Sequence, residues 1–158
     1  MLRIKQFFAL IVVVLGLASC ASTSDKPQDH IGEISQAQLN KRFLIFNKNY
    51  KAFALTKEQI DVVKALPKDL SVDIYFGTWC HDSEREVPRM LKALTHNSSV
   101  SINLIALDYQ KQDPKGEAIK AGIKFTPTFV IKQKGQEIGR IIERPQIDLI
   151  ADLAKFVG

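Results

Sequence analysis

A short apolar segment that leads almost directly into an amphipathic helix is the feature that most limits how this chain can fold. The segment 72–76 is apolar except for Asp73 and is bounded by turn residues, which predicts a buried β-strand. Apolar residues then recur at helical intervals, so we expect a helix over about 80–96, with Pro88 as a kink inside it. A strand followed at once by a helix is the building unit of α/β proteins.

The other periodic segments continue this pattern. In chain order we expect a short strand over 43–46, a helix from the capping box of Thr56 and Gln59 to Pro67, a strand over 102–107, a short helix over 115–121, a hairpin of 128–132 and 137–142, and a last helix opened by Pro145 with Ile147, Ile150, Leu153 and Val157 on one face. The segment 43–46 also fits part of a helix. The order predicts an α/β fold with a central mixed β-sheet flanked by helices.

Length and charge narrow the class of protein. A chain of 158 residues is long enough for about one domain. The formal net charge is +5, and it falls to +3 if Arg3 and Lys5 are removed with an N-terminal signal. The basic residues are spread along the chain without a run of five, so we expect no nucleic-acid partner.

The N-terminus has the layout of a secretory signal. Arg3 and Lys5 precede an apolar run from Phe7 to Leu17, and small residues follow. A transmembrane helix needs about 20 apolar residues, so this run is short for an anchor, although an uncleaved anchor remains the alternative.

The four residues that close this segment are Leu17-Ala18-Ser19-Cys20, and they resemble the lipobox of bacterial lipoproteins. The resemblance implies that a signal peptide of residues 1–19 is removed and that Cys20 is lipidated. Acyl chains on Cys20 would anchor the protein stably to a membrane of the cell envelope, facing the periplasm. Ala21 in place of Asp favours the outer membrane if the source is Gram-negative.

The polar residues 20–32 show no periodicity, which predicts a flexible tether that includes His30 as a solvated residue. We place the folded domain at 33–158. Of the two cysteines, lipidation would use Cys20 and leave Cys80 alone. An internal disulfide is then impossible, and the remaining thiol is either inert or reactive.

Three short motifs together resemble the thioredoxin family. Trp79-Cys80 follows the buried strand, Pro88 lies eight residues past the cysteine, and Phe125-Thr126-Pro127-Thr128 precedes the hairpin. The resemblance covers about 55–158. In that family the same spacing gives a W-C-x-x-C site and a cis-proline loop that faces the sulfur, so we expect a cis Thr126-Pro127 bond.

The chain departs from the family pattern at two positions. Ser83 stands where the family has its second, resolving cysteine, and Ile74 stands where thioredoxins often keep a buried acid. Cys80 lies at a helix start, where free N–H groups and the helix dipole stabilise a thiolate, the nucleophilic form. One helical turn on, Ser83 is placed to donate a hydrogen bond to that thiolate.

We therefore expect Cys80, with Ser83, to carry out monothiol thiol-disulfide exchange of the isomerase or reductase type. Trp79, His81, Thr126 and Pro127 are the expected substrate-binding residues, and the loop would pair with an extended peptide. The expected partners are cysteine-containing envelope proteins or small thiols, with no cofactor. A metal site is not expected, because Cys80, His81 and Asp82 are consecutive and their side chains diverge around the helix start.

Other readings of the lone cysteine stay open. Cys80 could be an inert structural thiol, or the domain could be a non-catalytic binding module that holds an envelope client protein. A third reading is a peroxide sensor that passes through a sulfenic acid.

Overall fold

The computed structural model describes residues 27–157. In this part of the chain the helices are α1 (Gln36–Arg42), α2 (Leu44–Ala52), α3 (Lys57–Lys64), α4 (His81–Leu94), α5 (Glu117–Lys120) and α6 (Leu149–Lys155). The strands are β1 (Gly32–Glu33), β2 (Leu70–Phe76), β3 (Ser101–Ala106), β4 (Thr128–Gln133) and β5 (Gln136–Ile142).

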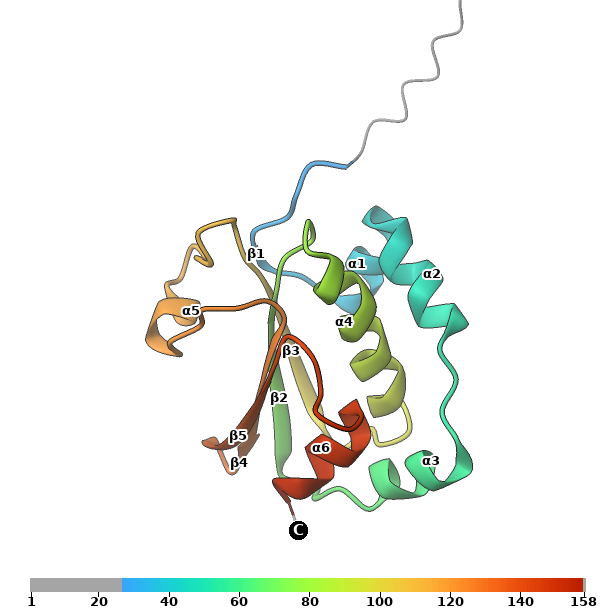
Figure 1. The fold of residues 1–158 in the computed structure, drawn as a ribbon. Coiled ribbons are helices and arrows are strands. Elements are labelled where there is room, and N and C mark those ends of the chain that lie inside the picture. Colours follow the sequence, from blue (N-terminus) through green and yellow to red (C-terminus); the bar gives the residue numbers. More distant parts are fainter. Residues whose placement is uncertain (1–26, 158) are drawn as a thin grey trace, which may run out of the picture.

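The strands of the described residues form one mixed sheet in the order β1-β3-β2-β4-β5. The central strand β2 is parallel to β3 and antiparallel to β4, while β1 and β5 are antiparallel edge strands. Helices α1–α4 and α6 lie on one face of the sheet and the short α5 on the other (Figure 1). The predicted α/β fold with a mixed sheet is confirmed.

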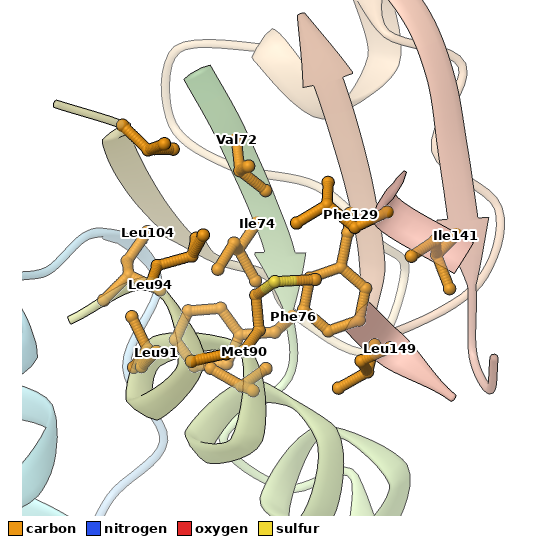
Figure 2. Close-up of a cluster of buried hydrophobic side chains, with 14 of the residues drawn as sticks. Val72, Ile74, Phe76, Met90, Leu91, Leu94, Leu104, Phe129, Ile141 and Leu149 are labelled. Carbon is orange, nitrogen blue, oxygen red and sulfur yellow. The ribbon is translucent and has the colours of Figure 1, made fainter. Parts of the chain in front are cut away.

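The main core lies between the sheet and α4, because alternate residues of β2 point to opposite faces. Figure 2 shows side chains of this core, with these labelled: Val72, Ile74, Phe76, Met90, Leu91, Leu94, Leu104, Phe129, Ile141 and Leu149. A smaller cluster on the other face joins Tyr75, Ile105 and Val130 to Ala118 of α5. Ile74, at the position where thioredoxins often keep an acid, is an ordinary member of the main core.

The short strand expected over 43–46 is wrong, because this segment belongs to the paired helices α1 and α2. A capping box of Ser35 and Gln38 starts α1. Leu39, Phe43 and Phe46 are buried, and their spacing of four and three residues is helical. A four-residue window was too short to reveal that period.

The elements expected after residue 55 are present, with shifted ends. The capping box of Thr56 and Gln59 starts α3, and Pro88 lies inside α4. The last helix, however, begins at Leu149 instead of Pro145, because the carboxylate of Asp148 accepts hydrogen bonds from the N–H groups of Ile150 and Ala151. Ile147, expected on the buried face, is 69% exposed.

The end of the expected tether lies against the domain. His30 is half-buried, and its ring nitrogens contact the carbonyl of Glu33 and the guanidinium of Arg42, so the expectation of a solvated His30 is wrong. Gly32 pairs with Ala106 in the sheet. Residues 1–19 and Cys20, for which we expect a signal peptide and lipidation, lie outside the described residues.

Across residues 27–157, none of the helices has both the length and the apolar character needed to span a membrane.

Candidate active site

Cys80 lies where the chain passes from β2 into α4. It is the N-cap residue of α4, and its side chain is half-buried. The Sγ–H group donates a hydrogen bond to the backbone carbonyl of Thr126, with 3.2 Å between sulfur and oxygen. The Thr126-Pro127 bond is cis, as predicted, so the sulfur and the proline loop face each other across the site.

The first turn of α4 combines the positive end of the helix dipole with two acidic side chains, Asp82 and Glu84. The first N–H groups of a helix have no partner within it and form the positive end of its dipole. Asp82 adds a negative charge to the same turn, but its carboxylate pairs with Arg85 at 2.8 Å and Arg144 at 3.2 Å. Burial raises the pKa of Asp82, but hydrogen bonds from the two arginines outweigh burial and hold that pKa below its usual value. The negative charge of Asp82 is therefore balanced by the positive charges of Arg85 and Arg144.

Ser83 is placed differently from our expectation. Its side chain is fully buried, and its Oγ accepts a hydrogen bond of 3.2 Å from the backbone N–H of Gly77. The expected bond from Ser83 to Cys80 is not among the hydrogen bonds that residues 27–157 form. The hydroxyl instead ties the first turn of α4 to the end of β2.

His81 stands apart from the other expected site residues. Its side chain is 94% exposed, and its Nδ1 lies 3.0 Å from Oε2 of Glu84, one helical turn away. The structure brings Trp79, Cys80, Thr126 and Pro127 to one edge of the sheet and leaves His81 on the solvent side of α4.

Trp79 is held by contacts to its ring and to its nitrogen. The indole N–H donates to the carbonyl of Leu107 at 3.1 Å. One face of the ring packs on Gly77, where an added Cβ would lie 2.6 Å from Cε2 of the indole. Tyr109 stacks on the indole with ring centroids 4.5 Å apart and an angle of 17°, and Nζ of Lys111 lies 4.7 Å from its centroid.

Sequence reasoning missed Tyr109 and Lys111 as neighbours of the site. The available signal was the order of the elements, because the carboxyl ends of two parallel strands meet at one edge of a sheet. Since β2 and β3 are parallel, the residues after Phe76 and those after Ala106 become neighbours.

Glu86 is a buried charged residue of α4. Glutamates are rarely fully buried unless they are paired, but Glu86 is only 2% exposed. Its Oε1 accepts hydrogen bonds from both arginines, and its Oε2 is buried with no partner among the described residues. Glu86 lies one turn further along α4 than Ser83 and does not contact Cys80 by a hydrogen bond.

The described residues contain no group of side chains that could bind a metal ion. Within residues 27–157, no three side chains of the His, Cys, Asp and Glu types gather closely enough to hold an ion.

Solved structures with similar folds are remote in sequence. A protein of unknown function from Pseudomonas aeruginosa is 14% identical, with a TM-score of 0.57 over 78% of this chain and 86% of that one. An HIV epitope scaffold is 12% identical, with a TM-score of 0.58 over the same shares. Thioredoxin f from spinach chloroplast is 23% identical over 67% of this chain and 98% of its own, with a TM-score of 0.47. None of the curated proteins matches this sequence significantly.

A family model described as thioredoxin matches residues 31–152, which is most of the chain and includes both Cys80 and the Thr126-Pro127 loop. The match agrees with the mixed sheet and with the cysteine at the start of α4. The chain therefore belongs to the thioredoxin family, whose members are of the thiol-disulfide oxidoreductase type.

Proposed function

We propose that this protein carries out thiol-disulfide exchange with a single cysteine, Cys80. The observation that carries the proposal is the position of Sγ, half-buried at a helix start and 3.2 Å from the carbonyl of Thr126. Residues 27–157 contain no second cysteine, and Ser83 occupies the position one turn on.

The exchange conserves electrons overall. The Cys80 thiolate attacks one sulfur of a disulfide, forms a mixed disulfide, and expels the other sulfur as a thiolate that takes up a proton. Ser83 cannot complete the cycle, because a hydroxyl does not displace a thiolate from sulfur. An outside thiolate, from the same client or from a small thiol, attacks next and regenerates the Cys80 thiolate.

This cycle suits two kinds of reaction. One is isomerisation, in which a second cysteine of the client displaces Cys80. The other is removal of a small-thiol adduct from a client, with a further small thiol as the reductant. Both fit the lack of a resolving thiol, whereas oxidation or reduction of a dithiol by the usual route of the family uses a second cysteine in the site.

The loop opposite Cys80 supports binding of an extended chain. The carbonyl of Thr126 accepts a hydrogen bond from the Cys80 thiol, so ionisation of Cys80 leaves that carbonyl without its donor. A backbone N–H of an extended substrate would then replace it, as in strand addition. Trp79, directly before Cys80, is only partly buried, so the exposed part of its side chain would contact the substrate.

The proposed location of the protein depends on lipidation of Cys20. A lipid on this cysteine would hold the domain at a membrane of the cell envelope, on the periplasmic side, and on the outer membrane in a Gram-negative source. The partners would then be cysteine-containing envelope proteins or small thiols of that compartment.

Trapping of mixed disulfides tests the proposal. Cells that produce the wild-type protein are quenched with acid, alkylated and separated without reductant, beside Cys80→Ala and Cys80→Ser variants. We expect adducts of higher mass in the wild type that collapse on reduction and are absent from both variants. If the wild type forms no adduct but still binds the same envelope proteins as Cys80→Ala, the domain is a non-catalytic binding module and the proposal is wrong.

A further inference from the structure

The segment before β1 contacts the active-site edge of the sheet through one carboxylate. Oδ1 of Asp29 accepts a hydrogen bond of 2.9 Å from the hydroxyl of Thr78, and Oδ2 accepts one of 3.3 Å from the hydroxyl of Tyr109. Asp29 therefore connects the loop after β2 with the loop after β3. Trp79 belongs to the first of these loops and stacks on Tyr109 of the second.

Thr78 is oriented by two hydrogen bonds. Its hydroxyl donates to Asp29 and accepts from the backbone N–H of His30 at 3.2 Å. The residue is 2% exposed, so water does not compete freely for these bonds. Because Thr78 directly precedes Trp79 and Cys80, these two hydrogen bonds also hold the chain at the start of that dipeptide.

Tyr109 has the matching role on the other side of the indole. Its ring stacks on Trp79, its backbone carbonyl accepts from Nζ of Lys111 at 3.0 Å, and that same Nζ lies over the indole. Desolvation, followed by the charge and hydrogen bond of Asp29, raises the pKa of Tyr109, which is 61% exposed. The phenol therefore stays protonated and able to donate to Asp29 over the physiological range of pH.

We propose that Asp29 and Tyr109 are positioning residues of the active site, which hold the Trp79 indole as a rigid wall for a peptide substrate beside Cys80. This inference rests on the proposed exchange function and extends it to substrate choice. Neither residue contacts the sulfur, so neither takes part in the bond changes. A rigid wall matters for a peptide that lies along the site and matters little for a small disulfide that touches only Cys80.

The proposal also gives the N-terminal segment a function. Asp29 is nine residues after Cys20, the expected lipid attachment point. The chain that leads away from Cys20 would therefore complete the substrate site before it enters the sheet at β1.

The test uses conservative variants and the single tryptophan of the chain, Trp79, as its probe. Asp29→Asn weakens both bonds, and Tyr109→Phe removes one bond but keeps the stacked ring. Glu33→Gln is the matched control, because it breaks an ion pair of the same segment with Lys115 without touching Thr78 or Tyr109. Urea unfolding checks that each variant is folded.

Two readouts separate positioning from general support of the fold. We expect acrylamide to quench the fluorescence of Trp79 more strongly in Asp29→Asn and Tyr109→Phe than in the wild type and Glu33→Gln. We also expect exchange with a peptide disulfide to slow by about 2- to 10-fold in these two variants, as for the loss of one hydrogen bond, while exchange with oxidised glutathione keeps its rate.

The two proposals fail in distinguishable ways. A wild-type protein that exchanges with neither disulfide contradicts the proposed function, whatever the quenching shows. Quenching constants equal to those of the wild type in both variants overturn the positioning role, whether or not the wild type exchanges. Equal slowing with the peptide disulfide and with glutathione overturns the link to peptide substrates.

Discussion

At the scale of single residues, the roles of the polar side chains in α4 depend on partners that lie outside the helix. Ser83 was expected to serve the sulfur, yet its hydroxyl accepts from the N–H of Gly77, which would otherwise be buried without a partner. A buried polar group without a hydrogen bond costs more free energy than a formed bond contributes. We therefore interpret Ser83 as a support of the junction between β2 and α4.

Ser83→Ala tests this interpretation. Loss of the acceptor leaves the Gly77 N–H unsatisfied, so the free energy of unfolding should fall by about 1–3 kcal/mol while the exchange rate of Cys80 stays the same. Urea unfolding and a thiol-exchange assay measure the two effects, and Ser98→Ala, at an exposed serine, is the control. A slower exchange at unchanged stability would instead show that the hydroxyl acts on the sulfur.

Glu86 is a buried carboxylate, and its Oε2 has no hydrogen-bond partner among residues 27–157. Its partners Arg85 and Arg89 are 35% and 41% exposed in their side chains, so water can solvate both guanidinium groups without Glu86. A buried ion pair of this kind is often no more stable than an apolar residue of similar volume.

We expect Glu86→Met to keep the free energy of unfolding or to raise it by about 1 kcal/mol. Chemical unfolding of the two proteins at neutral pH gives the difference. A loss above about 2 kcal/mol would mean that Oε2 has a hydrogen-bond donor, such as ordered water in the adjoining cavity of about 140 Å³ lined by Glu86, Phe53 and Pro145.

At the scale of elements, the predictions held where a segment carried more than a short apolar run. The helix expected over 80–96 is present as α4, because its pattern is long enough to show the helical period, and the strand over 72–76 is present as β2, because turn residues bound it on both sides. The four residues 43–46 offered neither signal, and the start of α6 was set by the cap at Asp148 instead of Pro145.

Asp152 ties α6 to the loop that precedes it. Its carboxylate accepts hydrogen bonds from the backbone N–H of Gln146 and from Nζ of Lys155, and it is 7% exposed. Burial raises the pKa of Asp152, but these hydrogen bonds outweigh burial and leave that pKa below its ordinary value. The charged form is thus favoured by folding.

This shift predicts an acid-dependent loss of stability. Because the folded pKa lies below the unfolded value of about 3.9, the contribution of Asp152 is present above that pH and is lost as pH falls through the folded pKa. Asp152→Asn should be less stable at pH 7 and should lose less of its unfolding free energy between pH 5 and pH 3 than the wild type. Urea unfolding across this range is the measurement, and parallel curves for the two proteins would contradict it.

At the scale of the whole molecule, the parallel pairing of β2 and β3 brings the site together. It places the loop with Trp79 and Cys80 beside the loop with Tyr109, and β1 adds the N-terminal segment at the edge of the same sheet. The segment that would lead from a membrane anchor therefore reaches the domain beside its active-site edge (Figure 1).

Cys20→Ser tests the anchor. The variant should lose its lipid and move from the membrane fraction to the soluble fraction, because an acyl chain supplies the membrane affinity. Fractionation of cells and labelling with a fatty acid measure both effects. Cys80→Ser is the matched control and should stay with the membrane; a Cys20→Ser protein that also stays there would point to an uncleaved apolar segment.

The sequence by itself determined the elements after residue 55, the place of Cys80 at a helix start and the proline loop of the family, because periodicity, capping and short motifs are local signals. Only the tertiary structure decided that Ser83 serves Gly77, that Glu86 is buried, and that Asp29 joins Thr78 and Tyr109 across 49 and 80 residues of chain. Those contacts depend on how strands pair and on which helix face is covered, and neither is encoded within a short window of residues.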